Sequence, residues 1–515
     1  MMTTTVPGLD RAPTTHRRLL AWVREMAELT TPDQVVWCDG SDRERDRLTT
    51  QLVHAGTLVP SPDEPDSLRV AADPADTARI GDHTYVCSRD PADAGPAGKW
   101  MDPVDMKIIL TEQFRGAMRG RTMYVVPFRT GPLGEDAELG VQITDSVHTV
   151  VSMRALARTG TAALAGFVDY DGAERDFLPY LHSVGAPLAP GQADVPWPCD
   201  HTKYLSYFPE ERMVWSYGSG HDGAPSLGRQ RSALRIASAL AREDGRLAEH
   251  MLILKLTGVE GTTHFIAAAF PPGCGRTTLA TAEPTSPGWQ IEALSHDVAR
   301  LRFGDDGRLY AVDPVAATGG APWGVPISAI LFGGRRGDTV PLITEARNWQ
   351  HGVFLGATLS TDEAGVVRRN PMAMLPLLGY HLGDYLRHWL DMGTRSDALP
   401  AVFLVNWFRR GADGRLLWPG FGENLRVLRW VVERVEGTAS GLVTPIGYVP
   451  TTAALDLSDV DAPIEDVRAA IAVDDAQWRA ELPLIRDWFD TIGDRLPSEL
   501  RDELHALTRR LAATP

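Results

Sequence analysis

The stretch FIAAAFPPGCGRTT, residues 265–278, decides which fold this chain can adopt. An apolar run leads into two closely spaced glycines, Gly273 and Gly275, and a basic residue follows them. This order predicts a buried strand, a tight glycine-rich loop and then the start of a helix. Glycines allow backbone N–H groups to approach phosphate oxygens, and the N-terminus of a helix favours negative charge. The stretch therefore indicates either a phosphate-binding loop or a plain glycine-rich turn between a strand and a helix.

The match to the general phosphate-loop motif, G-x-x-x-x-G-K-[ST], is incomplete at two positions. Phe270 stands where the motif has its first glycine, and Arg276 stands where it has lysine. Arginine keeps the positive charge, but it presents a planar fork of donors rather than a compact ammonium group. If the loop binds a phosphate, its members are Gly273, Cys274, Gly275, Arg276, Thr277 and Thr278. The hydroxyl group of Thr277 could then reach a divalent metal ion.

The alternation of strand and helix patterns continues on both sides of this stretch. Residues 33–56 predict a strand, a turn and a helix, and residues 232–256 predict a helix followed by a buried strand. Further strands are expected at 121–128, 141–153 and 289–303. The fold class is therefore α/β, with mixed sheets favoured over a purely parallel one.

We expect two lobes after a disordered N-terminus. Residues 1–15 are polar and rich in proline and threonine, which predicts disorder. The first lobe is expected at 16–206, and the second, which contains the glycine loop, at 207–515. Within the second lobe, residues 313–326 are rich in proline and glycine and predict a loop. Residues 476–512 have apolar side chains at helical spacing and predict a C-terminal helical cap.

The composition excludes several classes of protein. Of the 515 residues, 43% are apolar, which is typical of a globular chain and too many for a disordered one. The formal net charge of −16 argues against a nucleic-acid binder. Apolar runs such as Phe265–Phe270 are far shorter than the ~20 residues that cross a membrane. We see no secretory signal, so we expect a cytoplasmic protein. Four cysteines without C-x-x-C spacing exclude a disulfide framework and argue against a thiolate zinc site.

Two further segments contain candidate metal ligands. His296 and Asp297 follow a predicted strand, and an acidic residue at a strand end near a phosphate loop can hold a metal ion. His250 precedes the predicted strand at 251–256. A lone histidine is more often structural than a ligand, but three candidate ligands that flank consecutive strands strengthen the metal interpretation.

Long stretches of the chain match one known family in order, from about residue 20 to the C-terminal end. They are CSRDPADAGP (87–96), MRGRTMYVVPF (118–128), GPLG (131–134), LHSVGAPL (181–188), ALRIAS (233–238), LAEHMLIL (247–254), ILFGGRR (330–336), WQHGVF (349–354), NWFRR (406–410), WPGFGEN (418–424) and TPIGY (444–448). In these stretches the chain resembles the actinobacterial branch of the GTP-dependent phosphoenolpyruvate carboxykinase family. The resemblance implies an N-terminal substrate-binding α/β lobe and a C-terminal P-loop lobe, with the active site in the cleft between them. It also implies that oxaloacetate is decarboxylated and the resulting enolate phosphorylated by GTP, or the reverse, with Mn²⁺ in the site.

The resemblance also implies roles for individual residues. Catalysis is assigned to Arg121, His221, Arg276 and Arg336, with Arg335 as the alternative to Arg336. Substrate binding is assigned to Arg119, Arg121 and Gly223. Nucleotide binding is assigned to the six loop residues 273–278 and to Phe408, Phe421 and Asn424. Metal binding is assigned to His250 and Asp297, with His296, Gln230 and Thr277 as neighbouring candidates.

The departures from the family pattern fall on residues that carry the chemistry. Gln230 stands where the family has a metal-binding lysine, and Arg276 stands where it has the lysine of the phosphate loop. His296 replaces the first of two aspartates, and His221 replaces a tyrosine over the substrate. Leu416 replaces a third aromatic residue that clasps guanine. If the histidines and the remaining aspartate converge, their donor types favour Mn²⁺, Fe²⁺, Co²⁺ or Zn²⁺ over Mg²⁺.

Two family segments are missing or shortened. After AVDP (311–314) the family continues through a long segment that ends in Asn-Ser-Arg-Phe, and here several tens of residues are absent. The segment FLGATLSTDEAGVVRRNPMAM (354–374) leaves little of the mobile lid that should close over the site. Lids exclude water and protect reactive enolates.

Together these losses predict a changed reaction. We expect a metal-dependent lyase that acts on a small anionic 2-oxo or enol acid, similar to oxaloacetate, with GTP phosphotransfer weak or lost. One alternative is the orthodox GTP-dependent carboxykinase, and another is a non-catalytic protein with a binding or regulatory role. We favour Mn²⁺ as the metal, leave open whether GTP or GDP binds, and expect a monomer without a nucleic-acid or membrane partner.

Overall fold

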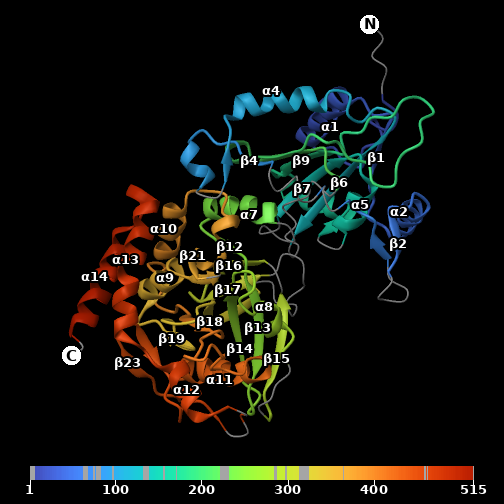
Figure 1. Cartoon of the computed structure of the whole chain (residues 1–515). Coiled ribbons are helices and arrows are strands. Elements are labelled where there is room, and N and C mark those ends of the chain that lie inside the picture. Colours follow the sequence, from blue (N-terminus) through green and yellow to red (C-terminus); the bar gives the residue numbers. More distant parts are fainter. Residues whose placement is uncertain are drawn as a thin grey trace. The chain divides into compact units, whose positions relative to one another are not determined.

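The computed structural model describes residues 6–513 except for 62–67, 74–75, 77–82, 96–97, 131–137, 155–156, 170, 221–230, 283–286, 296–297, 313–323, 364, 458–459 and 461. The chain forms two compact units, Met1–Leu240 and Ala241–Pro515. Figure 1 labels many of their helices and strands, and each unit is described by itself.

The first unit is built on a mixed sheet that has nine strands among the described residues. Their order is β1-β6-β7-β9-β11-β10-β4-β5, with β8 beside β6. The strands are β1 Gln34–Trp37, β4 Thr84–Val86, β5 Lys99–Trp100, β6 Thr122–Thr130, β7 Glu138–Thr144, β8 Arg158–Thr159, β9 Leu178–Ser183, β10 Tyr204–Phe208 and β11 Met213–Tyr217. β1 and β6 are parallel, whereas β6 and β7 are antiparallel, so the expected mixed sheet is confirmed.

Helices cover both faces of this sheet because side chains alternate along its strands. Met123 and Val125 of β6 belong to a core shared with α1 and α4. Tyr124 and Val126 belong to a second core shared with α2 and α5. The helices are α1 Arg17–Thr30, α2 Asp42–His54, α4 Pro103–Phe114, α5 Val147–Met153 and α6 Thr161–Leu164, and a separate hairpin is formed by β2 Leu58–Pro60 and β3 Leu68–Val70.

The strand expected at 141–153 is only partly present. β7 ends at Thr144, and α5 begins at Val147. The side chain of Ser146 accepts a hydrogen bond from the N–H of Thr149, which is a typical cap of a helix N-terminus. The expectation of a strand is therefore wrong beyond residue 146, where the apolar side chains belong to a helix.

Two limits of the first unit also differ from expectation. Residues 6–15 do not fit the expected disorder, because the N–H of Val35 donates to the carbonyl of Pro7 at 2.8 Å. The boundary expected after residue 206 falls inside β10, which pairs with β11 in the sheet of the first unit. The division lies later, within α7 Arg231–Glu243, where Leu240 still packs in a core of the first unit.

The second unit contains another mixed sheet, with eleven strands among the described residues. β14 and β18 are parallel, as are β18 and β22, and β13 is antiparallel to β14. The strands are β12 Leu247–Glu249, β13 Leu252–Thr257, β14 Thr263–Ala269, β15 Gln290–Ser295, β16 Ala299–Phe303, β17 Leu309–Val312, β18 Val325–Gly334, β19 Ile343–Glu345, β22 Ala401–Asn406, β23 Leu442–Thr444 and β24 Gly447–Val449. Most of the loop expected at 313–326 lies outside the described residues, and β18 begins at Val325.

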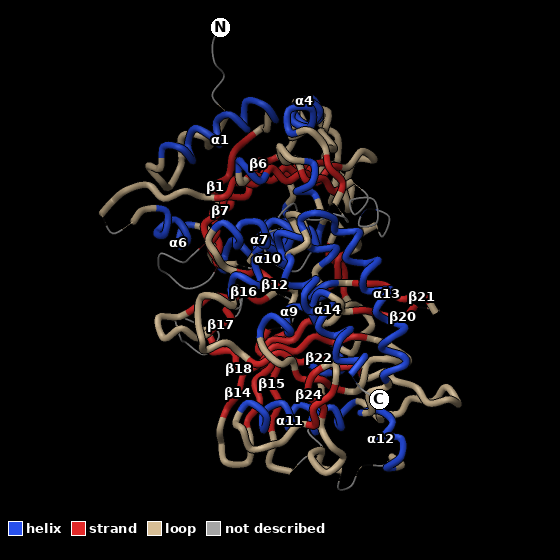
Figure 2. The backbone as a smooth tube through the Cα atoms, turned by 90° about the vertical axis from the view of Figure 1, so that its left-hand side faces the viewer, coloured by secondary structure: helices blue, strands red, loops and turns tan. Residues whose placement is uncertain are grey.

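Figure 2 shows the strands of the second unit between α11 on one side and α9 and α14 on the other. The helices are α8 Arg276–Ala280, α9 Trp349–Ala357, α10 Leu382–Met392, α11 Asn424–Val435, α12 Ile464–Ile471, α13 Asp475–Ile492 and α14 Ser498–Ala513, and a hairpin is formed by β20 Ser360–Glu363 and β21 Val366–Arg369. The last two helices occupy the range predicted for the helical cap. In the described part of the chain, none of the helices has the length and apolar character that a membrane span requires.

Candidate active site

The loop between β14 and α8 has the predicted order of strand, glycine loop and helix. Gly273 and Gly275 have φ angles of 75° and 97°, which only glycine adopts without strain. Gly275 caps α8, and the N–H of Leu279 donates to its carbonyl at 3.0 Å. Cys274 is buried between the two glycines, whereas Thr277 is exposed on the first turn of the helix. The loop therefore presents backbone and Thr277, rather than the thiol, to a ligand.

An arginine and an aromatic ring lie beside this loop. The Nη1 atom of Arg335 lies 3.4 Å from the carbonyl oxygen of Gly273, and its Cζ lies 5.0 Å from the centre of the Phe408 ring. Phe408 in turn lies 3.9 Å from the position that a Cβ would take at Gly275. Arg335 is exposed, so its charge is available to an anion at the loop. The geometry brings a cation and backbone donors to one place.

The segments that contain Arg335 and Phe408 are joined by Asn406, the last residue of β22. Its Oδ1 accepts from the N–H groups of Arg336 at 3.1 Å and Phe408 at 3.2 Å. Its Nδ2 donates to the carbonyl oxygens of Arg336 at 2.9 Å and Val340 at 2.8 Å. Sequence patterns alone do not distinguish Asn406 from other polar residues. Its signal is a polar residue at the end of an apolar strand, where parallel strands place their functional ends.

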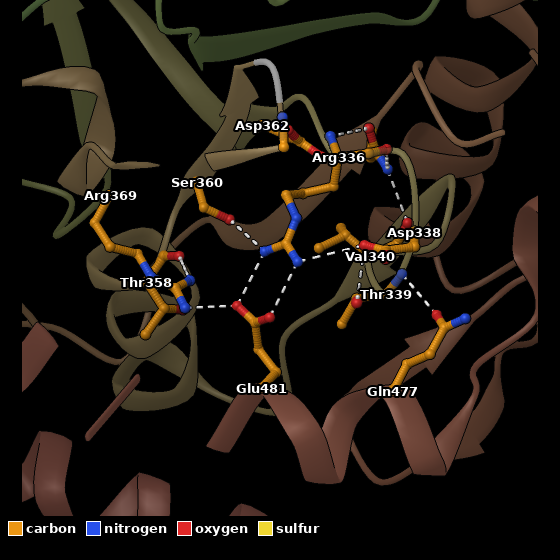
Figure 3. A network of polar contacts seen from close by, with 12 residues as sticks. Arg336, Asp338, Thr339, Val340, Thr358, Ser360, Asp362, Arg369, Gln477 and Glu481 are labelled. Carbon is orange, nitrogen blue, oxygen red and sulfur yellow. Dashed lines mark hydrogen bonds and ion pairs between the residues drawn. The ribbon is translucent and has the colours of Figure 1, made fainter. Parts of the chain in front are cut away.

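Arg336, expected to be catalytic, points toward Glu481 of α13 (Figure 3). It is buried, and its two Nη atoms each donate to one carboxylate oxygen of Glu481 at 3.0 Å. Burial lowers the pKa of Arg336, but the carboxylates of Glu481 and Asp338 together outweigh this effect and raise it. Between the two arginines considered for this role, Arg335 therefore lies at the loop, and Arg336 belongs to a buried ion pair.

His250 and Arg276 are in direct contact. The Nη1 atom of Arg276 donates to Nε2 of His250, and it lies 3.3 Å from Nδ1 of the same ring. A guanidinium group has only donors, so the accepting ring nitrogen must be unprotonated. Metal ions bind the same unprotonated form of histidine, so the donor chemistry of His250 fits a divalent transition metal.

Besides His250, Thr277 is the expected metal ligand that the structure describes, and it is exposed at the start of α8. Gln230, His296 and Asp297 lie outside the described residues, as do His221 and Gly223. In the described part of the chain, no three His, Cys, Asp or Glu side chains form a group that could hold a metal ion. The expected convergence of the histidines stays a prediction.

The arginine expected to bind substrate in the first unit already holds a carboxylate. Arg121, which is buried, donates from Nη1 and Nη2 to the two carboxylate oxygens of Asp194 at 2.7 and 2.8 Å. Its Nε donates to the carbonyl of Ala186 at 2.6 Å. Arg119 is exposed, and its Nε donates to the carbonyl of Gly116 at 3.2 Å. Of these two arginines, Arg121 therefore has the bidentate geometry that suits a carboxylate.

The residues expected at the nucleotide base have contrasting environments. The side chain of Phe421 is 74% exposed, and its backbone has a φ of 49°, which is strained for a residue other than glycine. Asn424 is buried at the start of α11, where its Oδ1 accepts from Nε1 of Trp418 at 2.9 Å. Leu416, at the position of the missing third aromatic residue, is also exposed. Phe421 is thus the more exposed of these two apolar side chains, and it is the aromatic one.

Comparison with known proteins covers nearly the whole chain. Residues 21–242 match the phosphoenolpyruvate carboxykinase N-terminal domain, and residues 246–320 and 315–510 match the phosphoenolpyruvate carboxykinase C-terminal P-loop domain. The chain is 45% identical over 604 residues to a GTP-type phosphoenolpyruvate carboxykinase of Paenarthrobacter aurescens, covering 98% of this chain and 99% of that protein. It is 43% identical over 609 residues to the enzyme of the same name from Corynebacterium kroppenstedtii, covering 99% and 97%.

This chain is shorter than these relatives. Its alignment with the first of them spans 604 positions, whereas the chain has 515 residues. At least 89 aligned positions, 604 less 515, therefore have no counterpart here. The segment where the lid was expected is the short hairpin of β20 and β21, in which Glu363 pairs with Val366.

Proposed function

Because the chain belongs to the GTP-dependent phosphoenolpyruvate carboxykinase family, we propose that it converts oxaloacetate and GTP to phosphoenolpyruvate, CO₂ and GDP. The similarity extends over both domains and nearly the full length of proteins that bear this name. It supports the complete reaction better than the reduced, nucleotide-independent reaction that the sequence departures suggested. Gluconeogenesis is the metabolic setting that the family implies.

The observation that carries this proposal is the loop of residues 273–278 with Arg335 beside it. A transferred phosphoryl group needs positioning and neutralisation of its negative charge more than covalent help from the protein. The backbone at Gly273 and Gly275, the exposed Thr277 and the guanidinium of Arg335 supply these. Phe408 and Phe421 would then hold the base.

The chemistry assigns separate tasks to the two units. Loss of CO₂ from oxaloacetate leaves the enolate of pyruvate, whose oxygen attacks the γ-phosphorus of GTP while GDP leaves. Arg121 would bind a substrate carboxylate in the bidentate geometry in which it now holds Asp194. A divalent metal, Mn²⁺ by preference, would stabilise the enolate charge. Its proposed ligands are His250, Gln230, His296, Asp297 and Thr277.

A second candidate function is decarboxylation to pyruvate without phosphoryl transfer. The observation that favours it is the contact between Arg276 and His250, because an arginine that binds a histidine is not placed to bind a phosphate. The loss of at least 89 aligned positions points the same way.

One experiment separates these functions. The purified protein is incubated with oxaloacetate and Mn²⁺, with and without GTP or GDP, and CO₂, pyruvate and phosphoenolpyruvate are followed together. We expect phosphoenolpyruvate only when GTP is present. Pyruvate that forms at the same rate without nucleotide would replace the proposal with the second candidate. Absence of all three products in every incubation would favour a non-catalytic role.

A further inference from the structure

Glu481 of α13 is a buried carboxylate that serves two arginines at once (Figure 3). Only 4% of Glu481 is exposed. It binds Arg336 through two parallel contacts of 3.0 Å, and its Oε1 also accepts from Nη2 of Arg369 at 2.5 Å. A buried charge destabilises the folded state unless oppositely charged partners hold it in well-aligned hydrogen bonds. Removing one of these three side chains should therefore disturb the other two.

Each of the two arginines anchors a different segment. Arg336 directly follows Arg335 in the chain, and its Nη1 also donates to Oγ of Ser360 at 3.2 Å. Arg369 ends β21 and faces Ser360 of β20 in the hairpin register, and its Nη1 donates to the carbonyl of Thr358 at 2.8 Å. Glu481 therefore holds the hairpin and the segment of Arg335 against the same helix.

The hairpin in turn fixes the backbone of Arg335. The N–H of Arg335 donates to the carbonyl of Ser360 at 3.2 Å, and its carbonyl accepts from the N–H of Asp362 at 2.6 Å. With its backbone held on both sides, the exposed side chain of Arg335 is directed toward Gly273 and Phe408. A long surface arginine would otherwise lose considerable side-chain entropy when it binds an anion.

We propose that Glu481 is a positioning residue that directs Arg335 toward the phosphate of the nucleotide. It acts through Arg336 and through the β20–β21 hairpin and does not touch the ligand itself. This inference rests on the proposed function, in which Arg335 meets a nucleotide phosphate. It gives α13 a part in ligand binding beyond covering the sheet.

The test compares GDP binding, by calorimetry with Mg²⁺, in wild type, Glu481→Gln and a matched control, Glu503→Gln. Glu503 is also a buried carboxylate of the C-terminal helices, and it accepts from Gln350 at 3.0 Å without contacting the Arg335 network. We expect Glu481→Gln to weaken GDP binding about tenfold and Glu503→Gln to leave it within about twofold. Hydrogen exchange at residues 333–337 and 360–369 should accelerate only in Glu481→Gln.

A double-mutant cycle separates positioning from general stability. In an Arg335→Ala background, Glu481→Gln should cost less than about twofold, because the residue on which it acts is gone. Arg369→Met removes one arm of the network while Arg336 still pairs with Glu481, so it covers the case in which Glu481→Gln does not fold. GDP binding that is unchanged in both variants, or weakened equally with and without Arg335, would overturn the inference and leave the proposed function intact. Absence of GDP binding by the wild type would overturn both.

Discussion

Replacing Arg276 by methionine should tighten the binding of Mn²⁺ to the nucleotide-free protein. The guanidinium of Arg276 occupies the lone pair of His250 that a metal ion would need, so metal binding must first break this contact. A hydrogen bond with a charged donor contributes ~1.5–3 kcal/mol, and each 1.4 kcal/mol corresponds to about tenfold in affinity. Both side chains are half-buried, which favours the lower end of this range. We therefore expect Arg276→Met to lower the Kd for Mn²⁺ about tenfold.

Calorimetry or the electron paramagnetic resonance signal of free Mn²⁺ would measure this change without any turnover. Arg335→Met is the matched control, because it also removes one cation beside the loop but leaves the contact with His250 in place. Screening limits the general electrostatic effect of that change to about threefold or less. Equal changes in Kd for the two variants, or none in Arg276→Met, would refute the competition between Arg276 and the metal.

Three further predictions concern single side chains. His250→Ala should reduce turnover of oxaloacetate more than about 100-fold with an unchanged melting temperature, and His264→Ala, which removes a histidine paired with Glu436, should leave turnover intact. Lys203→Met should lower the free energy of unfolding by about 3–5 kcal/mol in urea denaturation, because it leaves the buried carboxylate of Asp76 without its cation. A loss no larger than that caused by replacing an exposed lysine would contradict this prediction. Burial raises the pKa of Glu249 from 4.5 to about 8, so the folded state loses stability as the pH rises between these two values. Glu249→Gln should abolish this loss, which is measured by comparing melting temperatures at about pH 5 and about pH 8.

The sequence predicts those parts of the fold in which neighbouring local signals all favour the same structure. The apolar run before Gly273, the two glycines and the helix-forming residues after them point to one structure, and β14, the loop and α8 have it. The hydrophobic pattern gave a wrong prediction where it was compatible with both a strand and a helix. Val147–Met153 alternates like a strand, but the cap at Ser146 starts a helix there. A capping hydrogen bond of this kind is not detected by hydrophobic patterning.

The site is less predictable because its decisive contacts join distant positions. The sequence makes Arg335 and Arg336 nearly equivalent, whereas in the structure the buried one, Arg336, pairs with the carboxylate of Glu481, 145 residues away. Asn406 joins two strand ends whose adjacency follows from sheet order, and the order of strands is not a local property. Residue type and spacing predict the glycine loop and make His250 a candidate ligand, but they do not predict the direction in which a neighbouring guanidinium points.

In the proposed reaction, the features that the chain keeps and those that it lacks would act at different steps. The glycine loop and Arg335 would act on the phosphoryl donor, whereas a lid would protect the enolate after CO₂ has left. In this chain the lid segment is a hairpin held to Arg335 by two backbone hydrogen bonds and to α13 by the pair between Arg369 and Glu481. Such a hairpin positions an arginine but has little length with which to close over a substrate. Water would then compete with GTP for the enolate, so the ratio of pyruvate to phosphoenolpyruvate reports directly on what the shortening has changed.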